Sequence, residues 1–187
     1  LNYENKIPDN LLIKNRPVES GLISSLYKIK SIQLDKFISH RTKDARYGNG
    51  VCSVDFKLFE ESDPIINDLK NDLTDIMKSS LNSDIYIEDS FFNILRSGGG
   101  SIPHQHLTPI DNDKYLNLGK QKYSLVYYVS VGDQDCKEPG LLKLYDPDDN
   151  ILPSDGMIVV IPADRSHSSY YEGNKDRVMI GVNFYCL

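Results

Sequence analysis

Histidine is the residue type whose spacing in this chain points to chemistry. The chain has four histidines, and two of them, His104 and His106, are two residues apart, so on a β-strand both rings point to the same face. His167 comes much later and would reach them from a distant strand. Imidazole is a good ligand for iron, zinc, copper and nickel. The pattern predicts that these three histidines hold one metal ion, whereas His40 is assigned no role. A His-x-His pair is also typical of two surface histidines, so the segments around it decide.

The first of those segments, residues 1–82, has mainly helical patterning. Apolar residues recur there at spacings of three and four. Asp63 followed by Pro64 is typical of a helix start, with the acid at the N-cap and the proline in the first turn. We expect helices over 18–30 and 34–40, a strand over 51–58, and a helix opened by Ser62-Asp63-Pro64 with the apolar stripe Ile65, Ile66, Leu69, Leu73, Ile76, Met77 and Leu81.

Residues 83–187 contain short β-type segments separated by turn residues. The expected strands are 85–95, 102–107, 123–131, 141–145, 157–161, 168–171 and 178–185, with Gly98-Gly99-Gly100 among the separators. Many short strands of this kind are typical of a sandwich or barrel. We therefore predict one mainly β domain over 1–187. Its core over 83–187 is a double-stranded β-helix (a jelly-roll, cupin-like), and 1–82 forms a helical support packed on the outside of one sheet.

Composition limits the classes of function. The chain has 187 residues, of which 40% are hydrophobic and 26% charged, which fits a soluble globular protein. Its net charge is -6, whereas a nucleic-acid partner requires a basic face. No apolar stretch is long enough to cross a bilayer, and the first residues lack the pattern of a secretory signal. The three cysteines have no CxxC spacing. We expect a cytoplasmic protein without a nucleic-acid or membrane partner.

The segment around the paired histidines resembles the metal-binding region of iron(II)/2-oxoglutarate-dependent oxygenases of the prolyl hydroxylase type. In that family a glycine stands at a fixed distance before the first metal-binding histidine, and Gly98 stands at that distance from His104. The resemblance covers roughly residues 90–187 and is closest to uncharacterised oxygenases with a His-x-His motif. The other matching segments are 124–129 (SLVYYV), 140–147 (GLLKLYDP), 156–162 with the distal His167, Arg177, and 178–184 (VMIGVNF).

The resemblance implies a role for each matching residue. His104 and His167 would be metal ligands. Arg177 would bind the distal carboxylate of 2-oxoglutarate, since a guanidinium matches a carboxylate bidentately. Tyr128 would donate its hydroxyl to the same carboxylate. Asn183, on the same side of its strand as Arg177, is grouped with these cofactor-binding residues and could line the substrate side of the pocket.

One position departs from the family pattern. These oxygenases use two histidines and one carboxylate, and here His106 stands in the place of the carboxylate. Three readings are open: His106 is the third ligand, His106 is a bystander, or Asp111 or Asp113 reaches the metal from the following loop. We prefer the first, because strand geometry alone places His106 correctly. Three neutral imidazoles would leave the full 2+ charge on the site.

The same residues also resemble the two cupin motifs. Gly98, His104, His106 and Asp111 match the first, with aspartate in place of the usual glutamate, and 156–167 match the second. Cupins share the jelly-roll and use a metal without 2-oxoglutarate. A third alternative is a non-catalytic jelly-roll binding module with a closed metal site.

The predicted function is that of a non-haem iron(II) dioxygenase that uses 2-oxoglutarate and O2 to hydroxylate its substrate. Arg177, the paired tyrosines and the helical N-terminal region favour this oxygenase reading over the cupin. The substrate is expected to be a small molecule or a peptide of unidentified structure. The sequence gives no oligomeric state, and a homodimer stays open.

Overall fold

The computed structural model describes residues 11–30, 48–52 and 57–187, and in these ranges the chain is mostly β. The helix predicted over 34–40 lies outside the described residues. Within them, no helix combines the length and the apolar composition that crossing a bilayer requires. The strands are β1 (Leu12–Asn15), β2 (Gly48–Cys52), β3 (Ile85–His104), β4 (Lys122–Ser130), β5 (Leu142–Leu144), β6 (Asp149–Ile151), β7 (Met157–Pro162), β8 (His167–Tyr171) and β9 (Arg177–Cys186).

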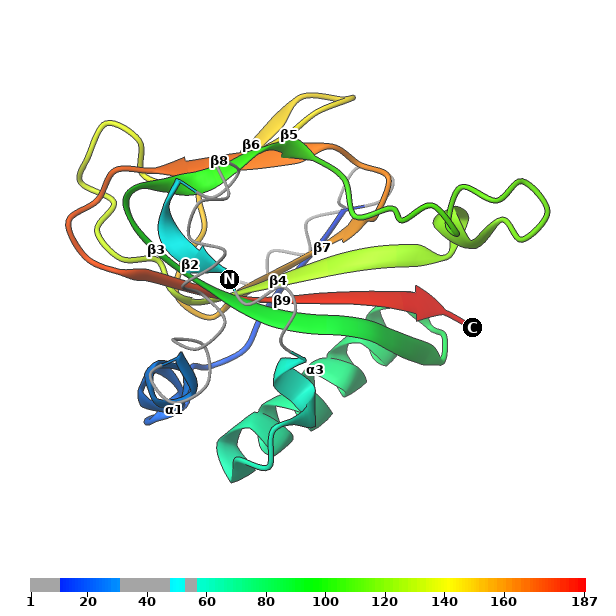
Figure 1. The fold of residues 1–187 in the computed structure, drawn as a ribbon, viewed down its shortest axis with the longest axis horizontal. Coiled ribbons are helices and arrows are strands. Elements are labelled where there is room, and N and C mark those ends of the chain that lie inside the picture. Colours follow the sequence, from blue (N-terminus) through cyan, green and yellow to red (C-terminus); the bar gives the residue numbers. More distant parts are fainter. Residues whose placement is uncertain (1–10, 31–47, 53–56) are drawn as a thin grey trace, which may run out of the picture.

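The long strand β3 connects two layers of one antiparallel sheet. Its first half pairs with β9, from Ile85 opposite Cys186 to Leu95 opposite Arg177. Its last residues pair with β8. Among the described strands the order is β1-β7-β4-β9-β3-β8-β5-β6, with β2 beside β3. Figure 1 shows the result: the sheet curls so that β8, β5 and β6 lie over β9, β4 and β7. This is the predicted jelly-roll.

The glycine triplet was expected to separate two strands, and that expectation is wrong. Gly98, Gly99 and Gly100 lie inside β3, which runs unbroken from Ile85 to His104. The reason is close approach of a neighbouring backbone: a Cβ on Gly100 would lie 2.2 Å from the carbonyl oxygen of Ser169 in β8. Glycine inside a strand commonly marks such an approach. The triplet therefore lets one strand pass from the lower layer to the upper one.

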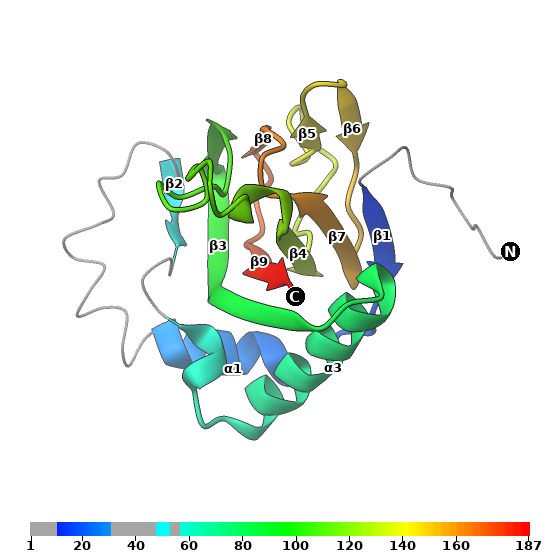
Figure 2. The same cartoon turned by 90° about the vertical axis from the view of Figure 1, so that its right-hand side faces the viewer.

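The two faces of the lower layer have different partners. Strand side chains alternate between faces, so Tyr127 and Tyr128 of β4 point in opposite directions. Tyr127 belongs to the core under the helices α1 (Leu22–Ile29) and α3 (Pro64–Leu81), and its hydroxyl accepts a hydrogen bond from Arg16. Tyr128 belongs to a second core between the layers. Figure 2 shows both helices lying against the outside of the lower layer, as predicted.

The helix predicted after residue 62 is α3, with the expected start. The Asp63 carboxylate accepts a hydrogen bond from the Ile65 amide, and Pro64 occupies the first turn. Four residues of the predicted stripe are fully buried under the sheet: Ile66, Leu69, Leu73 and Met77. The region before residue 83 also supplies strands β1 and β2 to the sheet. The sequence predicted the second of these in part, over 51–58, and missed the first.

The close contact at Gly100 gives a stability prediction. Gly100→Ala places a methyl group against the backbone of Ser169 and Tyr170, so β3 and β8 must separate locally. We expect a loss of about 1–3 kcal/mol in the free energy of unfolding, the usual cost of overpacking. Urea denaturation measures it, with Ile102→Ala, an exposed change on the same strand, as the control. A Gly100→Ala protein as stable as this control would contradict the interpretation that Gly100 allows the close approach of the β8 backbone.

Candidate metal centre

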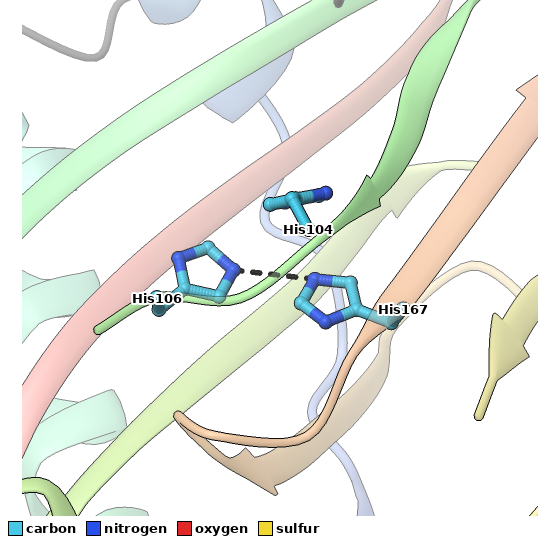
Figure 3. A group of neighbouring side chains, drawn as sticks. All are labelled: His104, His106 and His167. Carbon is cyan, nitrogen blue, oxygen red and sulfur yellow. Dashed lines mark hydrogen bonds between the residues drawn. The ribbon is translucent and has the colours of Figure 1, made fainter. Parts of the chain in front are cut away.

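The three predicted histidines meet between the two layers. His104 ends β3 and is the register partner of His167, the first residue of β8. One ring nitrogen of each histidine can be chosen so that all three lie within 4.8 Å of one another. The closest pair is Nε2 of His106 and Nε2 of His167, at 3.2 Å. Figure 3 shows the three rings gathered around one small volume. The predicted convergence is therefore present, and metal binding there stays a prediction.

Backbone carbonyl groups fix two of the rings in the tautomer that a metal needs. His104 Nδ1 lies 2.8 Å from the carbonyl oxygen of Ile102, and His167 Nδ1 lies 3.1 Å from that of Arg165. A carbonyl oxygen can only accept, so both Nδ1 atoms carry a proton, and in the neutral form of such a ring Nε2 keeps the lone pair that binds a metal. Histidine ligands are commonly oriented in this way, through a hydrogen bond from their other ring nitrogen.

The surroundings keep the rings of His106 and His167 uncharged. Burial and, to a smaller extent, the neighbouring His104 lower the pKa of His167 to about 4, against the opposing effect of the Arg165 carbonyl. Burial also holds the pKa of His106 well below its usual range, and His167, His104 and Lys122 add to this effect. Both rings are therefore neutral at pH 7, which is the state in which imidazole binds a metal.

The geometry fits a divalent transition metal. With metal–nitrogen bonds of about 2.1 Å, two neighbouring imidazole nitrogens are separated by about 3.0–3.4 Å. The 3.2 Å between His106 and His167 already has this value. Within the part of the chain that the structure describes, the cluster contains no cysteine or acidic side chain. Three nitrogen donors suit iron, nickel, copper or zinc, and they leave positions free for exogenous ligands.

The position of His106 has a different cause from the one predicted. His106 lies beyond the end of β3, so the argument that both histidines share one strand face fails. Its backbone amide donates a hydrogen bond to the carbonyl oxygen of Ala163, at 2.8 Å. The amide of Ala163 in turn donates to the carbonyl oxygen of Lys122, at 2.9 Å. The His106 ring is therefore placed by a loop anchored to β4 and the β7–β8 connection.

Neither aspartate of the following loop lies in the histidine cluster. Asp113 Oδ1 accepts from the backbone amide of Tyr115 at 2.8 Å, in an exposed turn. Asp111 is buried, and its Oδ2 accepts from Thr108 and from Lys122 Nζ, the latter at 2.7 Å. The geometry thus favours His106 over either acid as the third donor.

Asp111 belongs to a buried charge network beneath that loop. Lys122 is fully buried, and its Nζ lies 2.7 Å from Asp111 Oδ2 and 2.6 Å from Glu88 Oε2. The Tyr185 hydroxyl lies 2.6 Å from Asp111 Oδ1. Hydrogen bonds from Lys122, Tyr185 and Thr108 hold the pKa of Asp111 well below its usual range, against an opposing effect of burial that is the largest single contribution. The network fixes the loop that follows His106.

A cavity of about 220 Å³ adjoins the three imidazoles. Its floor is the inner face of β4 and β9, and its roof includes His104, His167 and Ser169. The lining runs from Tyr128 at one end of the inner face to Asn183 at the other. Between them lie the apolar side chains Phe91, Val126 and Met179. Tyr128 and Asn183, both predicted as site residues, therefore line this cavity.

Arg177 is buried at the Tyr128 end. Its side chain is 0% exposed, and its Cζ lies 5.1 Å from the ring centre of Tyr128 and 5.6 Å from that of Tyr171. Nη1 donates to the carbonyl oxygen of Pro139, whereas Nε and Nη2 have no hydrogen-bond partner. Burial lowers the pKa of Arg177, against the opposing effect of the tyrosines, but a guanidinium stays charged. Arg177 itself does not line the cavity in this structure.

Sequence reasoning missed several polar residues around the site. Ser124 lines the cavity opposite Asn183, and Lys122 continues the same inner face of β4. Their signal was present in the sequence: two polar residues stand at alternate positions in the first three residues of a strand that is then apolar and aromatic up to Val129. The partners of Lys122 could not be found in this way, because Glu88 and Asp111 lie on other segments.

The fold described above is also found in solved structures, among them the following three. The viral collagen prolyl hydroxylase of Paramecium Bursaria Chlorella virus-1, in its 2-oxoglutarate complex, matches with a TM-score of 0.65 and 10% identity, over 96% of this chain and 97% of that chain. The prolyl-4-hydroxylase of Pseudomonas putida matches with a TM-score of 0.62 and 14% identity, over 95% of this chain and 93% of that chain. HygX from Streptomyces hygroscopicus, with nickel and 2-oxoglutarate bound, matches with a TM-score of 0.61 and 11% identity, over 95% of this chain and 82% of that chain.

No protein-family model and no curated protein sequence matches the chain. At identities this low, the structural likeness shows a shared fold, that of the 2-oxoglutarate–iron(II) oxygenases. The fold agrees with the resemblance found in the sequence.

The three-imidazole geometry predicts one metal site per chain. Calorimetric titration with nickel(II) should show one tight site. His106→Ala should weaken nickel affinity by about a hundredfold or more, because loss of a metal ligand costs more affinity than loss of a residue that only hydrogen-bonds to a ligand. His40→Ala is the control, because His40 has no predicted role. Equal affinities for the wild-type and His106→Ala proteins would make His106 a bystander.

The buried network predicts a pH-dependent stability. Asp111→Asn leaves Lys122 with Glu88 alone, so we expect a loss of about 3 kcal/mol at pH 7. Because folding lowers the pKa of Asp111, its contribution is fully present above the unfolded pKa of about 4 and is lost progressively as the pH falls from there through the lower folded pKa. Urea denaturation at several pH values should therefore show the two proteins converging below about pH 4. Asp113→Asn should behave as wild type, and an undiminished Asp111→Asn difference at low pH would refute the role of its charge.

Proposed function

We propose that this chain is a non-haem iron(II) oxygenase that couples the oxidative decarboxylation of 2-oxoglutarate to the hydroxylation of a substrate. The observation that carries the proposal is the buried guanidinium of Arg177 behind a cavity lined by the metal-site histidines. A buried cation requires an anionic or strongly polar partner. Among the described residues Arg177 has one carbonyl partner, and its Nε and Nη2 are unpaired. A dicarboxylic acid that also chelates the metal supplies the missing anion.

The chain would bind the acid at two places. The imidazoles of His104, His106 and His167 would hold the iron, which would bind one carboxylate of the acid together with its neighbouring keto group. The distal carboxylate pairs with Nε and Nη2 of Arg177 and accepts a hydrogen bond from Tyr128, whose raised pKa, caused by burial, keeps its hydroxyl protonated. Since Arg177 does not line the cavity in this structure, the contact needs a side-chain rotamer change at Tyr128 or Arg177, which is common on binding.

The bound iron and 2-oxoglutarate would supply the oxidising chemistry: O2 gives one oxygen atom to succinate, with release of CO2, and the other to a C–H bond of the substrate. The remaining work falls to the chain. Phe91, Val126 and Met179 give the middle of the cavity apolar walls, which limit access of water. Asn183 lies at the end away from Arg177, about 20 Å along the strand, so we assign it to the substrate side.

The three-histidine donor set favours one alternative, a cupin-type metal enzyme that does not use 2-oxoglutarate. Without a carboxylate ligand, such a site keeps its full positive charge and could bind an anionic substrate directly. The two functions differ at Arg177, which the cupin-type enzyme does not need.

The test is binding and consumption of 2-oxoglutarate. The nickel(II)-loaded wild-type protein should bind 2-oxoglutarate in a calorimetric titration, and the iron(II)-loaded protein should form succinate from it in air. Arg177→Met removes the charge at similar length, so we expect the dissociation constant to rise about thirty- to hundredfold while nickel affinity is unchanged.

Arg96→Met, an exposed arginine on β3, serves as the matched control and should bind 2-oxoglutarate as wild type. A wild-type protein that binds nickel tightly yet neither binds 2-oxoglutarate nor forms succinate would remove this proposal in favour of the cupin-type alternative.

A further inference from the structure

The end of the cavity opposite Arg177 contains polar side chains that lack hydrogen-bond partners. Ser124 and Asn183 are direct cross-strand neighbours on β4 and β9. Ser124 is 1% exposed and Asn183 9%, and both line the cavity. Ser124 Oγ and Asn183 Oδ1 are buried without a partner. Buried polar atoms in folded proteins are nearly always paired, so an unpaired pair facing a cavity points to a ligand.

The side chain of Asn183 determines which hydrogen-bonding groups that ligand needs. An asparagine amide has one accepting oxygen and one donating nitrogen, and exchanging the two atoms leaves this requirement the same. The Asn183 Oδ1 atom has no hydrogen-bond partner in the described part of the chain. A ligand that pairs with both ends of the amide presents a donor and an acceptor side by side, and the Ser124 hydroxyl can serve either. A carboxamide has this arrangement.

The charges around this end exclude charged ligand groups. One step further along the same strands, Lys122 pairs with both Asp111 and Glu88, which leaves one surplus negative charge. That charge disfavours a carboxylate between Ser124 and Asn183. A divalent cation held by three neutral imidazoles disfavours an ammonium group in the same cavity.

We propose that Ser124 and Asn183 form a substrate subsite that binds an uncharged carboxamide. The inference rests on the proposed function, in which 2-oxoglutarate occupies the Arg177 end and the substrate the other. The cavity of about 220 Å³ is smaller than the sites that enclose drug-sized ligands, so it admits a short group. The carboxamide belongs to a small molecule or to a side chain of a peptide, and the chemistry of recognition is the same.

Three probes of equal length test the subsite: butanamide, butanoate and butylammonium. Each is titrated into ¹⁵N-labelled protein, with and without nickel(II) and 2-oxoglutarate. The side-chain amide signals of Asn183, assigned by their loss in Asn183→Leu, report binding in the wild-type protein, and the backbone amide signals of positions 124 and 183 report it in every variant. We expect butanamide to shift these signals and to bind at least about tenfold more tightly than either charged probe, the difference of one buried hydrogen bond.

Variants separate recognition from folding. Ser124→Ala, a conservative change, should weaken butanamide binding about five- to tenfold. Asn183→Asp exchanges the donor for a negative charge, so the preference should move from butanamide to butylammonium. Asn112→Leu, which alters an exposed asparagine outside the cavity, should bind as wild type. Acetylated and amidated Gly-Gln-Gly identifies a peptide source if it binds more tightly than butanamide, and a small-molecule source if it binds more weakly.

The subsite is refuted if butanoate or butylammonium binds as tightly as butanamide, or if butanamide binding survives in both Ser124→Ala and Asn183→Asp. Failure of the proposed function looks different. In that case 2-oxoglutarate does not bind, while the preference for butanamide persists in the protein without it.

Discussion

The site depends on one register: the pairing of β3 with β8 that sets His104 opposite His167. A shift by one residue would turn every side chain of β8 to the other face and remove His167 from the cavity. The register is possible because β3 passes from one layer to the other through glycines, one of which accepts a backbone where a Cβ would clash. The convergence of the histidines is thus a consequence of how the sheet folds over itself, and the helices outside it stabilise the lower layer without contributing a donor.

The two ends of the interior differ in net charge. The guanidinium of Arg177 lies buried at one end, and the Lys122 network lies at the other with one more negative than positive charge. The neutral imidazoles lie over the cavity between these ends, where burial lowers the pKa of His106 and His167. In the proposed function, an anion is favoured towards Arg177 and the metal, and a neutral polar group towards Asn183. This difference in charge would order two ligands in one small cavity without any contact between them.

The sequence predicted the elements whose signals are local and missed what depends on distant neighbours. Asp63 and Pro64 marked the start of α3, and the spacing of Gly98 from His104 pointed to the fold. Three consecutive glycines, however, indicate a turn when only the local sequence is considered. The adjacent backbone of β8 explains why they continue a strand. His106 was expected on the strand and lies beyond it, because a hydrogen bond to Ala163 sets its position. Arg177 and Tyr128 came from the family resemblance, and they lie next to each other. Their roles towards 2-oxoglutarate stay a proposal.

The central claim, that three imidazoles share one divalent cation, is tested most directly by X-ray absorption at the iron edge of the anaerobic iron(II) protein. The account predicts a first shell with three imidazole nitrogens at about 2.1 Å, together with lighter oxygen ligands that change when 2-oxoglutarate is added. A shell fitted by two imidazoles and a protein carboxylate, or by fewer than two imidazoles, would contradict it.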